Sequence, residues 1–600
     1  MAQKFASLQN IHFLLYDVFK VQSLNEIPYF EEHSRETFDL VTQTALRISS
    51  ETLHPHLSEM DKNPPCYQNS EVLVHPMVRA FMKESGAGGW ISANAPFDSG
   101  GQQLPFCITT SCYFLFAAAN YSASVYPLLT SGAAHLIESF GSDFLKETFI
   151  PGMYSGEWQG TMALTEPQAG SSLADITTRA VPIDSQTYRI KGQKVFISAG
   201  EHNGVDNIVH LLLARIENAP AGTKGISLFV VPKRRHDSRG DLVSNDVLCS
   251  GVYHKLGYKG APITHLIFGD NDDCIGYLVG EPNKGLSYMF QMMNEARLEV
   301  GTGAAAIASA AYYASLEYSR QRAQGRHVSC KAPSTAPVQI IEHADVKRML
   351  LFQKAIVEGS LSLILQCSVY HDRLRSESHD DKKKAGLLLD LLTPIAKTFP
   401  SEMGILSVSA GLQILGGYGY CDEFPLEQLY RDVRIHPIHE GTTGIQGIDL
   451  LGRKVLGENG AAMMAFMGEV GIAINKASSY SELKPYSDRM KLALEKLGVV
   501  TMKLASIAGK GQPELFLADA TLYLELFGLV AISWQWLLQG IAACEALSSS
   551  GQEPDSIFCQ SKIHTMKYFF HYETGKIDHL SERLLEDNDI TVNVPGDLFI

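Results

Sequence analysis

The chain has 600 residues, of which 45% are hydrophobic and 19% charged, and its formal net charge is −15. This length exceeds a single hydrophobic core, so about four folding units are expected, with the apolar share of a globular protein. The negative charge disfavours general binding to nucleic-acid backbones. Ten cysteines without CxxC spacing, and an N-terminus without a signal-peptide pattern, favour free thiols in a reducing cytoplasm.

The first expected domain, residues 1–157, is helical. Its segments 29–56 and 106–141 place apolar residues at helical spacing. The pattern changes in the second expected domain, residues 158–284. There, short β-branched and aromatic runs such as TYRIKGQKVFIS and NIVHLLLARI alternate with Gly, Pro, Asn and Asp. This pattern predicts a β-barrel or β-sandwich.

Helical spacing returns in the third expected domain, residues 285–472. A four-helix bundle is predicted from four stretches, at residues 285–326, 338–375, 385–420 and 445–472. Two interruptions are expected to be loops: residues 328–337, which contain two prolines, and the charge cluster 376–384. Residues 473–600 are expected to form an additional helical domain with an acidic balance. The predicted fold class is α+β and mainly α, with the β-domain second in order.

One segment, residues 526–544, could by length cross a membrane. It reads LFGLVAISWQWLLQGIAAC and contains no charged residue, and about twenty apolar residues span a bilayer. However, it contains Ser533, Gln535 and Gln539, and it lacks the flanking Lys and Arg of an inserted helix. A helix that is apolar all round is usual inside a large helical core. We therefore expect a buried helix, with membrane contact at most peripheral.

The residue with the strongest catalytic signal is Glu440, in the segment RDVRIHPIHEGTTGIQGIDLLGRK. It stands at the end of an expected helix, where Gly441 and Gly444 let the backbone approach a ligand closely. A carboxylate in this position can act as a base. Considered alone, a Glu before Gly is more often a solvated charge, so the interpretation depends on the other motifs.

These motifs follow one another in a fixed order along the chain: LTEPQAGSS at 164–172, KVFIS at 194–198, QILGGYGY at 413–420, RDVR at 431–434 and HEGT at 439–442. The ordered set resembles the acyl-CoA dehydrogenase family of flavoenzymes from about residue 75 to residue 460. Phrases such as SAGEHNGVDNIVHLLLAR and GTKGISLFVVPK are most similar to its 3-methylmercaptopropionyl-CoA-dehydrogenase-like branch. The resemblance implies that family's fold: an N-terminal helical domain, a middle β-barrel, a C-terminal four-helix bundle and, in this branch, a further helical region.

The implied activity is FAD-dependent α,β-dehydrogenation of an acyl-CoA thioester to the trans-2-enoyl-CoA, with electrons passed to electron-transferring flavoprotein. Glu440 corresponds to the family's base, which removes the α-proton while the β-hydrogen leaves as hydride to flavin N5. A carboxylate of ordinary pKa is too weak for this proton. The site must therefore raise the pKa of Glu440 by burial and acidify the thioester through hydrogen bonds to its carbonyl.

The resemblance also implies contacts to FAD from the β-domain. Thr165 corresponds to the residue that meets the isoalloxazine ring, and Ser171 to the hydroxyl that meets the pyrophosphate. Ser198 corresponds to the donor to flavin N5. Phe196 replaces the usual Trp beside the flavin, which keeps an aromatic face but removes the indole N–H.

Further cofactor contacts are implied in the helical bundle. Arg322 would reach the pyrophosphate of a neighbouring subunit's FAD, for which a guanidinium fork is suited. Gln413 and Gly417 correspond to positions near the adenosine half across the same interface, and Thr442 is a further cofactor-binding position. A homodimer or higher homo-oligomer is therefore expected.

The implied substrate contacts are Arg297, His439 and Gly441. Two positions near them depart from the family pattern. Ala296 stands where some relatives keep an alternative catalytic Glu, which makes Glu295 the fallback base. His439 replaces a common Tyr; below about pH 6.5 it could be cationic and lower the Glu440 pKa. A third departure is Ser172, which replaces the Asp usual after the Gly-Ser of the motif.

Several alternative functions remain open. An acyl-CoA oxidase would return the electrons to oxygen, and sequence motifs separate it poorly from a dehydrogenase. A DNA-binding protein on the same scaffold would need a basic C-terminal region, and a catalytically silent scaffold would not need Glu440. No metal is expected, because the HxxHE spacing of His436, His439 and Glu440 is not HExxH. The acyl chain is not defined by the sequence.

Overall fold

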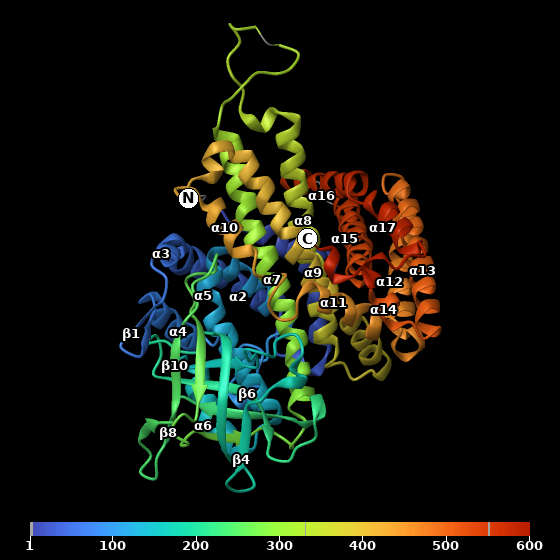
Figure 1. Ribbon diagram of the computed structural model, residues 1–600. Coiled ribbons are helices and arrows are strands. Elements are labelled where there is room, and N and C mark those ends of the chain that lie inside the picture. The colour runs from blue at the N-terminus through green and yellow to red at the C-terminus, as the bar shows by residue number, and fades with distance from the viewer. Residues whose placement is uncertain (1–3, 331, 550–552, 600) are drawn as a thin grey trace. The chain divides into compact units, whose positions relative to one another are not determined.

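The computed structural model describes residues 4–330, 332–549 and 553–599, and the chain divides into two compact units (Figure 1). The β-unit comprises residues 44–104 and 115–296, and the helical unit comprises residues 1–43, 105–114 and 297–600. Three helices cross the borders: α2 (Arg35–Ile48), α5 (Phe106–Phe140) and α7 (Gly285–Gln321). The expected division into four domains stays a prediction.

The centre of the β-unit is an eight-stranded sheet with the order β10-β11-β5-β12-β7-β6-β3, in which β4 pairs with β5 and β6. Its strands are β3 (Trp158–Ala163), β4 (Arg179–Pro182), β5 (Thr187–Ser198), β6 (Asn207–Ile216), β7 (Ile226–Pro232), β10 (Val247–Val252), β11 (Ile263–Phe268) and β12 (Ile275–Leu278). Two small hairpins are formed by β1 (Cys66–Gln68) with β2 (Glu71–Leu73), and by β8 (Arg234–His236) with β9 (Leu242–Ser244). The expected β-barrel-like middle domain is confirmed.

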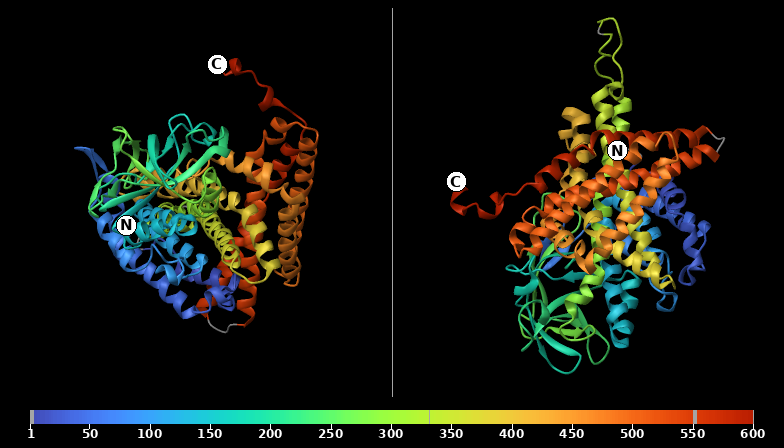
Figure 2. Two further views of the ribbon diagram at one scale, coloured as in Figure 1. Left: turned by 90° about the horizontal axis from the view of Figure 1, so that it is seen from below. Right: turned by 90° about the vertical axis from the view of Figure 1, so that its right-hand side faces the viewer.

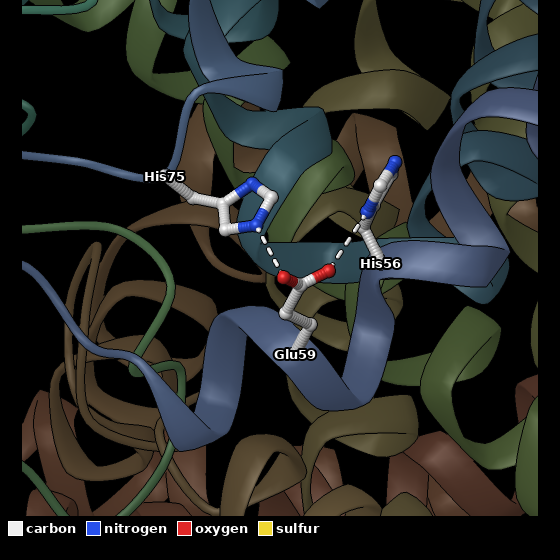
Figure 3. A group of neighbouring side chains, drawn as sticks. All are labelled: His56, Glu59 and His75. Atoms are coloured by element: carbon white, nitrogen blue, oxygen red, sulfur yellow. Dashed lines mark hydrogen bonds and ion pairs between the residues drawn. The ribbon is translucent and has the colours of Figure 1, made fainter.

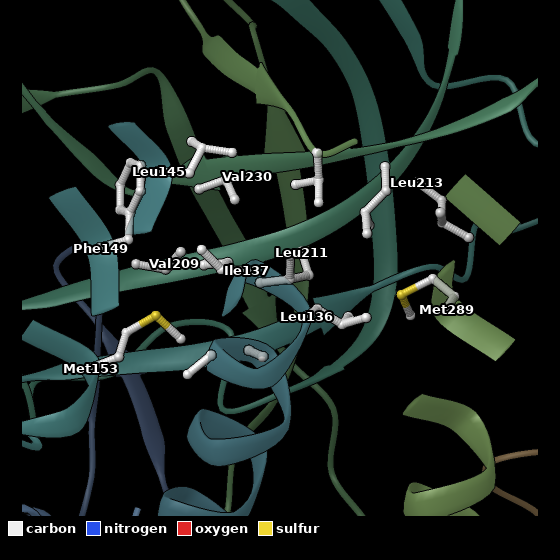
Figure 4. Close-up of a cluster of buried hydrophobic side chains, with 14 of the residues drawn as sticks. Leu136, Ile137, Leu145, Phe149, Met153, Val209, Leu211, Leu213, Val230 and Met289 are labelled. Carbon is white, nitrogen blue, oxygen red and sulfur yellow. The ribbon is translucent and has the colours of Figure 1, made fainter. Parts of the chain in front are cut away.

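Both faces of this sheet are covered, which explains the continuous apolar run of β6. Val209, Leu211 and Leu213 pack against α5 and α6 (Asp143–Tyr154) on one face (Figure 4). Leu212 and Ala214 point to the opposite face, where they join a second buried cluster. Successive β6 residues thus contribute to two cores in turn, as the period of two in a strand requires. The β-unit also contains the short helices α3 (Leu57–Lys62) and α4 (Met77–Ala87).

The helical unit gathers the later helices of the chain (Figures 1 and 2). Its long members after α7 are α8 (Ala344–Arg373), α9 (His379–Leu415), α12 (Ala461–Ser478), α13 (Lys484–Gly509), α15 (Ala520–Ser549) and α16 (Glu553–Tyr572). Shorter helices are α1 (Leu8–His12), α10 (Pro425–Val433), α11 (Thr443–Asp449), α14 (Pro513–Leu517), α17 (Lys576–Leu585) and α18 (Ile590–Asn593). The mainly helical fold with additional C-terminal helices is confirmed.

Two sequence expectations within this unit are wrong. The charge cluster 376–384 is not wholly a loop, because α9 begins at His379, where the Ser378 side chain accepts a hydrogen bond from the Asp381 N–H. Residues 445–472 are not one helix either. Between α11 and α12 the chain turns through Glu458, Asn459 and Gly460, all with positive φ. The helix α12 then runs from Ala461 to Ser478 and therefore crosses the expected boundary at residue 472.

The apolar helix α15 is buried within its own unit. Its Trp536 Nε1 donates to the Ala355 carbonyl of α8 at 3.1 Å, and its Gln535 Oε1 accepts from Ser362 at 2.7 Å. Gly359 of α8 allows this close approach, since a Cβ there would lie 2.8 Å from the Trp536 nitrogen. Among the residues that the structure describes, two helices, Ala344–Arg373 and Ala520–Ser548, are long and apolar enough to span a membrane, and 83% and 94% of their most apolar windows are buried in the protein. The expected buried helix is confirmed.

The packing of α15 yields a stability prediction. Trp536→Ala should lower the apparent unfolding temperature by several degrees, because truncating a buried Trp costs about 3–5 kcal/mol. Differential scanning calorimetry measures the effect. Trp536→Phe is the matched control: it keeps most of the ring volume and loses only the donor to Ala355, so its loss should be clearly smaller. Equal losses in the two variants would contradict a role in packing.

Candidate active site

Glu440 lies in the turn between α10 and α11. Its φ is 52° and that of Gly441 is 88°, so two successive residues occupy the left-handed region. For a Glu this conformation costs on the order of 1–3 kcal/mol and persists only where the surrounding structure holds it. Thr442 ends the turn as the N-cap of α11, where its side chain accepts from the Ile445 N–H at 3.4 Å. The backbone at the candidate base is therefore strained.

Two buried side chains hold this turn. Lys397 of α9 donates from Nζ to the carbonyls of His436 at 2.6 Å and Gly441 at 2.9 Å. Gln446 of α11 donates from Nε2 to the carbonyls of Glu440 at 3.1 Å and Gly441 at 3.4 Å. Both side chains are fully buried. The Glu440 side chain therefore extends from a backbone that is fixed on either side.

The Glu440 carboxyl is accessible to solvent but poorly solvated. Its side chain is exposed, yet desolvation by the surrounding protein raises its pKa, while the charges of Arg297 and Lys397 act in the opposite direction. A raised pKa makes the carboxylate a stronger base, and the two cations favour its ionised form. This arrangement suits proton abstraction.

Arg297, an expected substrate contact, forms a buried ion pair. Its Nη1 lies 3.0 Å from Asp449 Oδ2, and the side chain is almost fully enclosed. Arg453 lies 2.6 Å from the other oxygen of Asp449. Within the described residues, the Arg297 Nε makes no hydrogen bond. Arg297 therefore acts on Glu440 through its charge, and its contact with substrate stays a prediction.

The expectation of a cationic His439 beside the base is wrong. Burial, followed by the charges of His436 and Lys397, holds the pKa of His439 well below its usual range. The His439 ring is perpendicular to the His436 ring, and the two ring centroids are 5.4 Å apart. A neutral His439 does not lower the pKa of Glu440, contrary to the expectation from the sequence.

The fallback base, Glu295, lies in the β-unit with a different partner. Its Oε2 is 3.1 Å from Nδ1 of His135, a residue of α5. Glu295 is thus engaged in an ion pair with an imidazole. Glu440, in contrast, has an exposed side chain, which leaves Glu440 as the better candidate.

In the β-unit, a buried ion pair anchors the TEPQAGSS loop to β5. Lys194 Nζ lies 2.9 Å from Glu166 Oε1 and donates to the Leu164 carbonyl at 2.9 Å. Glu166 also accepts from the N–H groups of Thr177 at 2.6 Å and Thr178 at 3.0 Å. Burial alone would raise the pKa of Glu166, but Lys194 and these hydrogen bonds lower it to about 2. The Glu of this motif is therefore an anchor that fixes the loop around Thr165.

Of the other expected flavin residues of the β-unit, Phe196 and Ser198 lie in β5, and Thr165 and Ser171 lie in the loop after β3. Phe196 has a φ of 60°, which is unusual for an aromatic residue, and its side chain is 60% exposed. Its ring stacks on Tyr253, with centroids 4.6 Å apart. Thr165 and Ser198 are half-buried, and Ser171 is exposed. β5 thus presents an exposed aromatic ring two positions before Ser198.

The expected interface residues of the helical unit are exposed. Arg322 follows directly after the end of α7, and Gln413 lies in the last turn of α9. Gly417 lies in the short 3-10 helix Gly416–Tyr420, and a Cβ there would meet no atom within 4 Å. These residues are accessible to a ligand or a second subunit.

A separate group in the β-unit, His56, Glu59 and His75, could hold a metal ion (Figure 3). Glu59 accepts from both imidazoles, with His56 Nδ1 at 3.3 Å and His75 Nε2 at 3.4 Å. However, His75 Nδ1 accepts from the Met77 N–H at 3.2 Å, so the proton of a neutral ring lies on Nε2. A metal-bound imidazole needs a free lone pair on that nitrogen. Hydrogen bonding to Glu59 therefore accounts better for this group.

Models of known families match four consecutive parts of the chain. They describe the acyl-CoA dehydrogenase N-terminal domain (residues 35–157), middle domain (161–271) and C-terminal domain (283–456), followed by an acetyl-CoA dehydrogenase C-terminal-like region (462–595). The chain belongs to the acyl-CoA dehydrogenase family. Its members are FAD-dependent oxidoreductases, so the expected enzyme class and cofactor are confirmed.

Several similar acyl-CoA dehydrogenases match this chain over most of their own length. The chain is 38% identical to 3-methylmercaptopropionyl-CoA dehydrogenase of Ruegeria pomeroyi, over 87% of this chain and 88% of the relative. It is 36% identical to a butyryl-CoA dehydrogenase of Syntrophomonas wolfei, over 90% of each chain. An acyl-CoA dehydrogenase from Bacillus anthracis, solved in complex with FAD, shares the fold with a TM-score of 0.74 at 21% identity, covering 94% of this chain and 90% of that one.

The residues of this acyl-CoA dehydrogenase fit FAD. The exposed ring of Phe196 offers a flat apolar surface of the kind that an isoalloxazine ring needs. At Gly170 a Cβ would meet only the Thr165 methyl group, at 3.9 Å, so the loop is open to the close approach of a pyrophosphate. The hydroxyl donors of the β-unit also suit phosphate oxygens.

Sequence reasoning missed Lys397, Gln446 and the role of Lys194. A signal existed for Lys397, because it is a lone cation in the apolar stretch LLLDLLTPIAKTFP of a predicted bundle helix. A lysine in such a place is either exposed or satisfied by specific acceptors. Gln446 gave no comparable signal, since a Gln in the first turns of a short helix is ordinary.

The Glu166–Lys194 pair yields a prediction for the β-unit. Glu166→Gln should lower the unfolding temperature and the FAD content per protein, because removing one partner of a buried pair costs about 3–5 kcal/mol. Since the pKa of Glu166 is lowered, its stabilisation is present at neutral pH and lost only as the pH falls toward 2. Melting curves and flavin absorbance measure both effects. The double variant Glu166→Leu with Lys194→Met, which removes both charges, should recover part of the stability; no recovery would contradict this explanation.

Proposed function

We propose that this enzyme oxidises an acyl-CoA thioester to the trans-2-enoyl-CoA, with Glu440 as the base that removes the α-proton. The observation that carries the assignment is the Glu440 turn: a strained, doubly clamped backbone that presents an exposed carboxylate of raised pKa. The names of two relatives, a butyryl-CoA and a 3-methylmercaptopropionyl-CoA dehydrogenase, point to short unbranched acyl chains as the first substrates to test.

In this mechanism the α C–H bond breaks toward the Glu440 carboxylate, and the α,β double bond forms as the β-hydrogen departs. Thr165, Ser171 and Ser198, with Phe196 beside them, would hold FAD, which would supply the acceptor for the departing hydride. Arg297 and Lys397 favour the ionised form of Glu440 before the transfer. The Glu440 N–H has no acceptor among the described residues, so it is available to a thioester carbonyl and can stabilise the developing enolate.

We also propose that the enzyme is a homo-oligomer with a shared cofactor site, and that electron-transferring flavoprotein receives the electrons. The exposure of Arg322, Gln413 and Gly417, which the family resemblance assigns to a neighbouring subunit's FAD, supports the shared site. The rival acyl-CoA oxidase would consume oxygen at the rate of substrate oxidation. An oxygen electrode therefore distinguishes the two acceptors. The net charge of −15 continues to argue against the DNA-binding alternative.

Replacing the base tests the assignment directly. Glu440→Gln should retain FAD and bind butyryl-CoA, but its flavin should be reduced at least 100-fold more slowly, because removing a general base typically costs 10²–10⁴-fold. Anaerobic stopped-flow absorbance records the reduction. Glu295→Gln is the matched control and should behave like the wild type. The base assignment fails if Glu440→Gln is reduced at a near-normal rate, or if Glu295→Gln is the inactive variant.

The raised pKa of Glu440 predicts the pH dependence. Because the base acts only when ionised, kcat/KM should fall tenfold per pH unit once the pH drops below that pKa. The fall should begin above about pH 4.3, the value for an exposed Glu. Initial rates across a pH series in one mixed buffer measure the profile. A profile that stays flat down to about pH 4.3 would contradict desolvation by the surrounding protein as the cause of a raised pKa.

A further inference from the structure

Lys397 is a buried cation in the middle of a helix, and its neighbours from residue 391 to residue 401 are uncharged. It lies in α9, its side chain is fully enclosed, and the residues around it from 391 to 401 are also buried. Burial lowers the pKa of Lys397 to about 8, although Glu440 and Glu402 act in the opposite direction. Keeping an ammonium group in such surroundings is unfavourable unless acceptors compensate for the lost water.

The acceptors of Lys397 lie on both sides of the base. One is the carbonyl of His436, four residues before Glu440, and the other is the carbonyl of Gly441, the next residue. A single ammonium therefore closes the segment that carries Glu440. Both contacts are tertiary rather than local, because α10 separates α9 from the turn along the chain.

This closure acts where the backbone most needs support. Glu440 and Gly441 both have positive φ, a conformation that an unsupported chain seldom keeps at a Glu. Gln446 contributes a second hold through the carbonyls of Glu440 and Gly441. Lys397 and Gln446 thus share the support of the turn, but only Lys397 brings a charge.

The charge of Lys397 bears on the base as well. The groups that act on the Glu440 carboxyl are desolvation, which raises its pKa, and the cations Arg297 of α7 and Lys397 of α9, which lower it. Glu402 of α9 hydrogen-bonds Thr443, and the two nearby imidazoles, His436 and His439, have pKa values far below the usual range and are neutral. Lys397 is therefore one of two cations that favour an ionised base.

We propose that Lys397 is the positioning residue of the catalytic base. It holds the carbonyls of residues 436 and 441 so that the Glu440 carboxylate is presented to the α-hydrogen of the thioester, and its charge favours the ionised form of that carboxylate. The proposal rests on the assignment of Glu440 as the base. It differs from a merely structural role, which would affect folding but neither proton abstraction nor its pH dependence.

The test measures proton abstraction alone. A 3-thia analogue of butyryl-CoA has sulfur in place of the β-carbon, so it has no β-hydrogen to transfer and only its α-hydrogens can exchange. Proton NMR in D2O follows that exchange, with the wild-type holoenzyme as reference. Lys397→Met should slow the exchange about 100-fold, as expected when a reacting group is misplaced by about 1 Å. The dissociation constant of the analogue should stay within about threefold of the wild-type value, because Lys397 is not proposed to contact the analogue.

Two further variants separate position from charge. Gln446→Leu loosens the turn without removing a cation, so exchange should slow while the pH at which it becomes half-maximal stays unchanged. Lys397→Met removes the cation as well, so that pH should move upward, because the ionised base loses a favourable partner. Lys397→Arg restores the charge and should recover part of the rate. If Lys397→Met fails to fold, Lys397→Gln takes its place: it keeps a hydrogen-bond donor but removes the charge, so its half-maximal pH should also move upward, and an unchanged half-maximal pH would overturn the proposal.

Lys562→Met is the matched control. Lys562 is also fully buried with a pKa lowered to about 8, but it bonds Glu358 and Gln539 in another part of the helical unit. This variant should lower the melting temperature and leave the exchange rate per folded enzyme unchanged. Exchange within a few fold of wild type in Lys397→Met, or a half-maximal pH that does not move, would overturn the proposal. Persistent exchange in Glu440→Gln would instead refute the base assignment itself.

Discussion

The candidate active site depends on keeping one carboxylate ionised in surroundings that remove its water. Desolvation strengthens Glu440 as a base but also favours its protonated form, which cannot accept a proton. The charges of Arg297 and Lys397 offset part of this effect, and both cations are themselves buried. Each needs its own acceptors: Asp449 for Arg297, and two carbonyls for Lys397. The requirements of one carboxylate thus extend to α7, α9 and α11.

A second buried lysine follows the same chemical pattern in the β-unit. Lys194 pairs with Glu166 and also donates to the carbonyl of Leu164, directly before the loop that contains Thr165. In both units, therefore, an ammonium fixes a backbone segment next to expected functional residues. Backbone carbonyls are well suited to this role because they cannot ionise, so the pH range of these holds is set by the lysine donors alone.

The sequence reveals the residues that carry local signals. The motif around Glu440, the strand that ends at Ser198 and the apolar helix with Trp534 and Trp536 are readable because motif, alternation and composition are local properties. The break before α12 was readable too, since Gly457-Glu458-Asn459-Gly460 is a turn-forming sequence. Pairings such as Arg297 with Asp449, 152 positions apart, depend on helix packing and have no local signal. The neutral state of His439 likewise follows from burial, which the sequence does not give.

The left-handed backbone at Glu440 also limits which residues can occupy that position. Asn, Asp and Gly adopt positive φ at low cost, whereas β-branched residues do so at high cost. A substitution at position 440 must therefore meet two requirements. Gly and Asn tolerate the backbone conformation, but they lack the carboxylate that the chemistry needs. Asp satisfies both criteria but has one methylene less. The conformation that presents the base thus narrows the evolutionary routes by which this site could change its catalytic group.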